Sequence, residues 1–140
     1  IVTGGPGWVA QCENSETLNF VRRYAAGRVV AGVCTGAMIL AAAGILDGCK
    51  ATTKCEIAGT EVPPARLMRE RHPRIDVTED ASLVDCGSVI TAGGVTLGID
   101  ATLYLLSRLV GEDVASETAR IMEYSRSWRV NREALPVIVQ

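Results

Sequence analysis

The chain has 140 residues, of which 48% are hydrophobic, and this is enough for one domain with its own core. It carries 14 Lys and Arg residues against 16 Asp and Glu, so its net charge of −2 offers no basic surface for nucleic acid or an anionic membrane. No apolar run reaches the ~20 residues that a membrane-spanning helix needs. We therefore expect a single domain over residues 1–140 that binds neither nucleic acid nor a membrane.

The first residues, Ile1 to Thr3, predict the end of a buried strand, and the glycine-rich loop that begins with Gly4 and Gly5 follows. Backbone N–H groups in such a loop can approach a ligand closely, although a plain tight turn is the commoner use. Neither phosphate-loop pattern is present, which excludes nucleotide binding here. Because the chain starts inside an apolar strand, without methionine or a signal-peptide pattern, we expect it to be N-terminally incomplete.

A helix capped by Asn14 or Ser15 is predicted to run to about Ala26. The apolar run Val29 to Val33 then predicts a buried strand, and the small residues from Gly36 to Ala43 predict a helix. The junction between them is Gly32-Val33-Cys34-Thr35-Gly36. This is G-x-C-x-G, the cysteine form of the nucleophile elbow.

The elbow explains the residue types around Cys34. A sharp turn brings the positions two before and two after the nucleophile together, so glycine at both avoids a clash. The nucleophile sits on strained backbone and points out of the turn. Free N–H groups of the following helix favour a thiolate. The alternative is that Cys34 is a buried small hydrophobe, as most free cysteines are.

Short elements follow in the middle of the chain. Ala51 to Thr53 predicts an extended piece, Ala65 to Arg71 a helix, and Ile75 to Thr78 an edge strand. The helix is rich in arginine, which invites an anion-binding hypothesis. A solvated face is favoured instead, because no aromatic residues interleave. Leu83 to Thr91 predicts a hairpin that turns at Asp85-Cys86-Gly87.

A second glycine-rich loop, with Gly93 and Gly94, leads into the apolar run Ile99 to Val110, predicted as a mostly buried helix. Another helix is predicted from Asp113 to Tyr124. Ser125 to Gln140 shows no clear period, and Val137 to Val139 is either a short strand or a tail that packs on a partner.

Alternating strands and helices predict an α/β protein with a mostly parallel sheet covered on both faces. Sites in such sheets lie beyond the carboxyl ends of the strands. The loops of Gly4-Gly5 and Gly93-Gly94 can therefore converge on Cys34.

The five cysteines are odd in number and contain no C-x-x-C pair. This spacing predicts neither a disulfide framework nor a zinc site, and a single histidine further limits metal binding. We expect no metal and reduced cysteines in a cytoplasmic protein.

The elbow resembles the ThiJ/PfpI superfamily, whose members are similar to class I glutamine amidotransferases. The resemblance continues through Ala42 to Gly48, Ala51 to Thr53 and Ile90 to Asp100, and it spans the chain to about Tyr124. The Cys-Thr-Gly form and the Ala-Thr-Thr segment are most similar to the isonitrile hydratase branch. They also resemble the sensor domain of some AraC-type transcription regulators.

The resemblance implies a flavodoxin-like three-layer sandwich, usually a homodimer, that acts on a small molecule without a cofactor. Cys34 corresponds to the nucleophile, and Thr35 would position the substrate or a water. The backbone N–H groups of Gly5 and Thr35 would form the oxyanion hole. Gly4, Gly93 and Gly94 belong to the site loops.

Two departures from the family pattern matter. The acidic partner of the cysteine lies in the first part of the family fold, about 60 residues of strand–helix units that we expect to precede Ile1. Lys54 stands where relatives often have histidine. His72 is predicted to be a surface residue, so we expect no Cys–His dyad and no protease or amidase activity.

The leading hypothesis is a cysteine-dependent hydratase or hydrolytic enzyme for a small carbon–nitrogen substrate such as an isonitrile. The alternatives are glyoxalase or deglycase chemistry on small aldehydes, and a non-enzymatic ligand- or redox-sensing domain. Ser125 to Gln140 is too short for a helix-turn-helix module, which weakens the sensor hypothesis for this chain.

Overall fold

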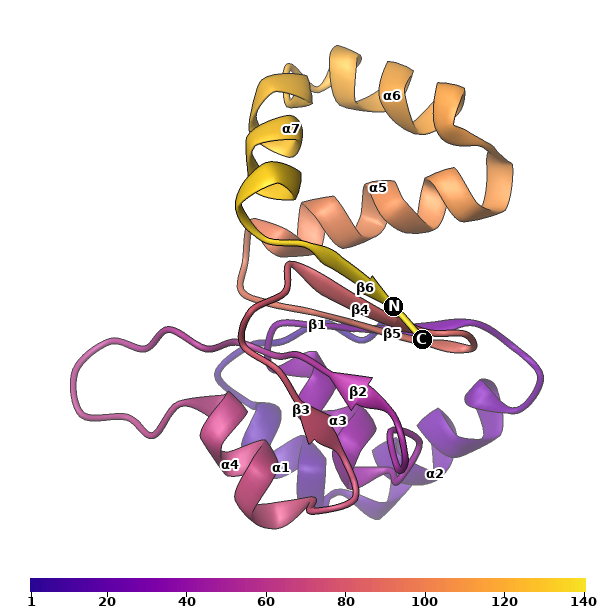
Figure 1. Ribbon diagram of the computed structural model, residues 1–140. Helices are drawn as coiled ribbons and strands as arrows, with labels where there is room; N and C mark the ends of the chain where they lie inside the picture. Colours follow the sequence, from indigo (N-terminus) through magenta and orange to yellow (C-terminus); the bar gives the residue numbers. More distant parts are fainter.

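The computed structural model describes residues 1–140 as three layers, with one sheet between two groups of helices (Figure 1). Helices α1 to α4 lie below the sheet in this view, and α5 to α7 lie above it. In chain order the elements are α1 (Trp8–Glu13), α2 (Ser15–Ala25), β1 (Val30–Val33), α3 (Gly36–Ala42), β2 (Lys50–Ala51), α4 (Pro64–Arg71), β3 (Asp76–Val77), β4 (Leu83–Cys86), β5 (Val89–Ala92), α5 (Leu97–Val110), α6 (Glu112–Ile121), α7 (Ser125–Ala134) and β6 (Val137–Val139). The predicted three-layer α/β class is confirmed.

The central sheet has the strand order β1-β5-β4-β6. Strand β1 runs parallel to β5, and β4 runs parallel to β6, while the β4–β5 hairpin is antiparallel. Val2 forms a parallel bridge with Gly32, which places the N-terminal segment on the outer side of β1. Strands β2 and β3 form a separate parallel pair. The mostly parallel sheet is thus confirmed, and the C-terminal apolar run is a strand.

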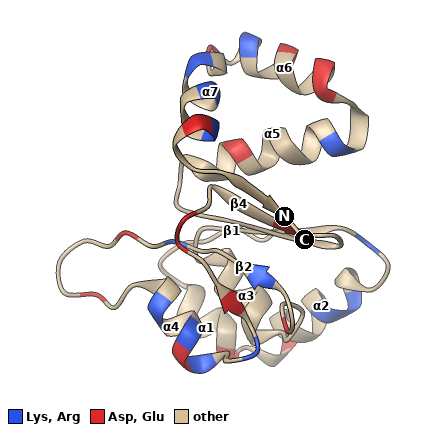
Figure 2. Cartoon of the chain, viewed as in Figure 1, with Lys and Arg blue, Asp and Glu red and all other residues tan.

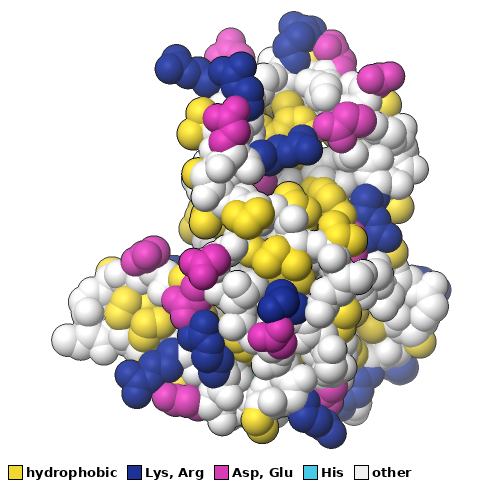
Figure 3. Space-filling model, in the orientation of Figure 1, with side chains coloured by type: hydrophobic (Ala, Val, Ile, Leu, Met, Phe, Trp, Pro, Cys, Tyr) yellow, Lys and Arg dark blue, Asp and Glu magenta, His cyan; other side chains and the backbone are white.

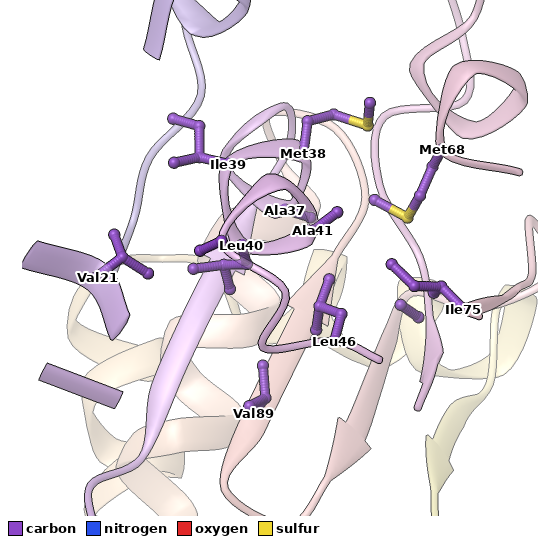
Figure 4. Close-up of a cluster of buried hydrophobic side chains, with 12 residues drawn as sticks. Val21, Ala37, Met38, Ile39, Leu40, Ala41, Leu46, Met68, Ile75 and Val89 are labelled. Atoms are coloured by element: carbon purple, nitrogen blue, oxygen red, sulfur yellow. The ribbon is translucent and has the colours of Figure 1, made fainter. Parts of the chain in front are cut away.

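The largest part of the core surrounds α3, below the sheet (Figure 4). Its first six residues, Gly36 to Ala41, are all buried. Met38 and Leu40 of this helix lie in one apolar cluster with Val21 of α2, Met68 of α4 and Val89 of β5. The helix that follows Cys34 is therefore held from several sides, and this fixes the geometry of the elbow.

Two smaller clusters fix the upper helices. Ala31 and Ile90 of the sheet pack against Ala101 of α5, and Leu103 of the same helix packs against Trp128 of α7. Charged residues of both signs are interspersed over the helices of both layers, as Figure 2 shows. No helix in the structure combines the length and the apolarity that crossing a membrane would require.

Three predicted segments were wrong in extent. The loop after Gly5 contains helix α1. This helix has no buried residue and no side-chain cap, so the sequence shows neither the hydrophobic periodicity nor the capping residue that would predict it. The hairpin turns at Gly87 and Ser88, because Asp85 and Cys86 still pair with Ile90 and Val89. The segment after Tyr124, in which no period was found, begins with helix α7.

Helix α5 is also less buried than its composition predicted. Only Asp100, Ala101 and Leu103 are buried, while Leu109 and Val110 at its end are exposed. One side of the helix packs on the sheet and another on α6 and α7, and the remaining apolar side lines an open groove with Ile1 and Val29. The prediction of a mostly buried helix is therefore wrong for this chain by itself.

The expectation that all cysteines are reduced is contradicted by a disulfide between Cys49 and Cys86, whose Cα atoms lie 6.0 Å apart. Cys49 directly precedes β2 and Cys86 ends β4, so the bond ties these two strands together. Cys12, Cys34 and Cys55 remain free. The pairing joins residues 37 positions apart, so it depends on tertiary contact rather than on spacing.

We predict that three thiols react with an alkylating reagent in the unfolded, unreduced protein, and that five react after reduction. Intact mass measurement counts the labels. A Cys49→Ser/Cys86→Ser double variant should give three labels under both conditions. Five labels without reductant in the unsubstituted protein would contradict the disulfide.

Candidate active site

Cys34 lies at the junction of β1 and α3 with φ of 56°, in the left-handed region that non-glycine residues rarely adopt. Both elbow glycines are required sterically. A Cβ atom on Gly32 would lie 2.8 Å from the Cα of Ala37, and one on Gly36 would lie 2.2 Å from the carbonyl oxygen of Val2. The predicted nucleophile elbow is therefore present in the backbone, with its strain at the cysteine.

Cys34 is half-buried and lines a cavity of about 600 Å³ at the carboxyl end of β1. The alternative of a cysteine enclosed in the core is excluded, because the residue borders an open space. The lining residues come from the first glycine-rich loop, α1, the elbow, the segment before α4, and α4 itself: Gly5, Pro6, Trp8, Val9, Cys34, Thr35, Lys54, Glu61, Val62, Pro64, Leu67 and Arg71.

The backbone of Cys34 is held by two other segments. Its N–H donates to the carbonyl oxygens of Ala92 and Gly93, at 3.0 and 2.9 Å. The hydroxyl of buried Thr53 donates to its carbonyl oxygen at 2.8 Å. The second glycine-rich loop thus contacts the nucleophile through Gly93, whereas Gly94 lines a neighbouring cavity beside Cys55.

We expect Thr53→Val to lower the free energy of unfolding by about 1 kcal/mol, the usual contribution of one hydrogen bond. The effect is limited because the Cys34 carbonyl oxygen still accepts a hydrogen bond from the N–H of Ala37, at 3.2 Å. Urea denaturation measures it. Thr102→Val is the control, since the exposed hydroxyl of Thr102 donates only to the carbonyl oxygen of Gly98 in the same helix. Equal losses in both variants would contradict a specific role for Thr53.

The first glycine-rich loop lies against Thr35. A Cβ on Gly4 would be 2.5 Å from Thr35 Oγ1 and 2.8 Å from its backbone nitrogen, so only glycine fits. The N–H of Gly5 donates to Thr35 Oγ1 at 3.1 Å, while the N–H of Thr35 donates no hydrogen bond within the chain. Thr35 therefore offers a free donor beside Cys34. The N–H of Gly5 can donate to an oxyanion only when the oxyanion displaces the Thr35 hydroxyl, which now accepts this hydrogen bond. The oxyanion hole stays a prediction.

Ionisable groups near Cys34 differ from a Cys–His arrangement. His72 does not line the cavity. It is half-buried rather than fully exposed, and desolvation, with the adjacent Arg71, holds its pKa below the usual value. Glu61 is the one carboxylic acid among the lining residues.

Sequence reasoning missed Lys54 and Arg71 as lining residues. Lys54 was noted only as a departure from the family pattern, and Arg71 was assigned to a solvated helix face. That assignment holds for all three arginines of the helix, because the side chains of Arg66, Arg69 and Arg71 are exposed. Two of them, Arg66 and Arg69, form ion pairs with Glu70 and Glu79. Arg71, two residues after Arg69, also lines the cavity of Cys34.

A three-layer α/β fold with a cysteine at a strained strand–helix elbow defines a class of proteins in which that cysteine is positioned to react. Residues 1–108 match the DJ-1/PfpI family, and the chain belongs to this family.

Comparison with individual proteins gives three informative similarities. The chain is 38% identical over 125 residues to isonitrile hydratase of Pseudomonas putida, covering 89% of this chain and 50% of that protein. It is 30% identical over 129 residues to the HTH-type transcriptional regulator GbdR of Pseudomonas aeruginosa, covering 90% of this chain and 32% of the regulator. The crystal structure of a ThiJ/PfpI family protein from Pseudomonas syringae matches with a TM-score of 0.72 and 30% identity, over 89% of this chain and 50% of that one. The chain thus spans half the length of the hydratase and about a third of the regulator.

Proposed function

We propose that this chain carries the nucleophile of a cofactor-free enzyme that hydrates a small carbon–nitrogen substrate of the isonitrile type. The observation that supports the proposal most strongly is Cys34, at φ of 56° on the elbow and on the wall of an open cavity of about 600 Å³. The 38% identity to isonitrile hydratase extends over 125 residues, or 89% of this chain.

The proposed reaction begins with addition of the Cys34 thiolate to the terminal carbon of the isonitrile. A carbon–sulfur bond forms, and the carbon takes a proton, which gives a thioimidate. Water then adds to the same carbon. The free N–H of Thr35 stabilises the oxygen of this tetrahedral intermediate as its charge develops. The carbon–sulfur bond breaks, nitrogen takes a proton, and an N-substituted formamide leaves with the thiolate restored.

The experiment incubates full-length protein with a simple alkyl isonitrile and measures the formamide by mass spectrometry. A parallel incubation with methylglyoxal tests the aldehyde alternative. Formamide that appears in proportion to protein supports the proposal. Consumption of methylglyoxal without formamide from the isonitrile would overturn it in favour of glyoxalase or deglycase chemistry.

A sensing role is the second candidate, because the similarity to a transcriptional regulator covers 90% of this chain. A sensor binds its ligand without turnover. A redox sensor would form sulfinic acid at Cys34 under mild peroxide, which peptide mass spectrometry detects. Sulfinic acid at Cys34 together with no product from either substrate would favour this role.

A further inference from the structure

The cavity beside Cys34 has two cationic side chains that the proposed reaction does not use. Lys54 and Arg71 both line it, together with a single carboxylate, Glu61. Neither cation takes part in any of the seven ion pairs of the chain, whereas Arg66 and Arg69 of α4 both do. The wall next to the nucleophile is therefore positive by one charge, in a chain that is negative overall.

The backbone of Lys54 lies close to the reacting centre. It directly follows Thr53, whose hydroxyl holds the Cys34 carbonyl oxygen at 2.8 Å. Lys54 is half-buried between the cavity of Cys34 and the neighbouring cavity, and it lines both. Its ammonium group donates one hydrogen bond within the chain, to the carbonyl oxygen of Glu56. An ammonium has three N–H donors, so two remain for a ligand.

Arg71 ends α4 on the same cavity wall, near α1. Arg66, Arg69 and Arg74 donate to carboxylates within the chain, whereas the guanidinium of Arg71 does not. The side chain of Arg71 is exposed at the cavity wall, so its N–H groups are available to a carboxylate. Its charge also acts on the neighbouring α1, where it opposes the rise in the pKa of the Cys12 thiol that burial causes.

The loop between β2 and α4 carries the opposing charge. This loop projects from the body of the molecule in Figure 1, and its lobe in Figure 3 presents apolar and acidic side chains together. Glu61, near its end, is exposed and forms no ion pair. Removing this carboxylate should therefore change the potential of the cavity in the opposite direction from removing Lys54 or Arg71.

We propose that the cavity selects small molecules that carry a carboxylate, with Lys54 and Arg71 binding the carboxylate while the electrophilic carbon meets Cys34. The two cations are then specificity-determining residues, and Glu61 weakens the selection. In its catalytic form this inference rests on the proposed function, and it names the substrate class as anionic isonitriles. The preference of Cys34 for anions can be measured whether or not the protein turns over an isonitrile.

The first experiment compares alkylation of Cys34 by iodoacetate, an anion, and by iodoacetamide, its neutral analogue. In both reactions the thiolate forms a sulfur–carbon bond and iodide leaves. Peptide mass spectrometry of the full-length protein isolates the rate at Cys34 from those at Cys12 and Cys55. The reference is the ratio of the two rates for a neutral small thiol in the same buffer.

We expect the iodoacetate-to-iodoacetamide ratio at Cys34 to exceed the reference about 5- to 10-fold at low salt, as expected for one half-buried and one exposed charge. Lys54→Gln and Arg71→Gln should each lower it about 3-fold, and Glu61→Gln should raise it. Arg129→Gln, at an exposed arginine of α7 without an ion pair, is the control and should leave it unchanged. A ratio equal to the reference, or one that folded Lys54 and Arg71 variants leave unchanged, would overturn the proposal.

The second experiment measures hydration of isocyanoacetate and of its neutral methyl ester. A higher kcat/KM for the acid, lost in Lys54→Gln mainly through KM, supports both proposals. Equal turnover of acid and ester overturns the anion preference and leaves the hydratase proposal standing. Turnover of neither, with the alkylation ratios as expected, overturns the hydratase proposal and supports carboxylate binding by the cavity.

Discussion

Replacing Cys34 by alanine should lower isonitrile hydration by at least about 10³-fold, because the variant lacks the only group proposed to bond to the substrate carbon. The fold should persist, since α3 is held by its buried face and not by the thiol. Product formation measured at substrate concentrations below KM gives the loss in kcat/KM. Turnover within 10-fold of the unsubstituted protein would contradict nucleophilic catalysis by this residue.

Two further variants distinguish the chemical role of the Cys34 thiol from the backbone strain at this position. Cys55→Ala removes another half-buried free thiol, which lies beside the neighbouring cavity, and should leave turnover unchanged. Cys34→Gly should be as inactive as Cys34→Ala but more stable by about 1 kcal/mol, because glycine adopts φ of 56° without the steric cost that alanine meets. Thermal unfolding of the two variants measures this difference. Equal stabilities would show that the elbow stores no strain at Cys34.

The part of the site that the sequence predicted is local in the chain. The two elbow glycines lie within two residues of Cys34, and their steric role follows from the turn alone. The loops of Gly4 and Gly93 were predicted from the rule that sites lie at the carboxyl ends of parallel strands, which needs only the order of elements. Both loops do contact the elbow, through Thr35 and through the N–H of Cys34.

The features that sequence reasoning missed depend on where distant segments meet. Arg66, Arg69 and Arg71 have the same chemistry and lie on one helix, yet only Arg71 faces the cavity of Cys34, because α4 ends beside α1. The Cys49–Cys86 disulfide joins β2 to the β4–β5 hairpin, and no cysteine spacing encodes that approach. The burial of α5 was overestimated because composition shows how apolar a helix is, but not which neighbours cover it.

Gly36→Ala should lower the free energy of unfolding by about 3 kcal/mol, the upper part of the usual cost of overpacking. Its Cβ would lie 2.2 Å from the carbonyl oxygen of Val2 and 2.9 Å from the carbonyl carbon of Thr3, and these backbone atoms cannot move freely. The same carbonyl of Val2 accepts the N–H of Val33 at 3.0 Å, so relief of the clash would break the contact between the N-terminal segment and β1. Gly98→Ala is the matched control, because its nearest neighbour would be Val33 Cβ at an ordinary 3.6 Å. Urea denaturation of both variants gives the difference in the free energy of unfolding. If Gly36→Ala loses no more stability than Gly98→Ala, close contact with Val2 is not the reason that the elbow requires glycine.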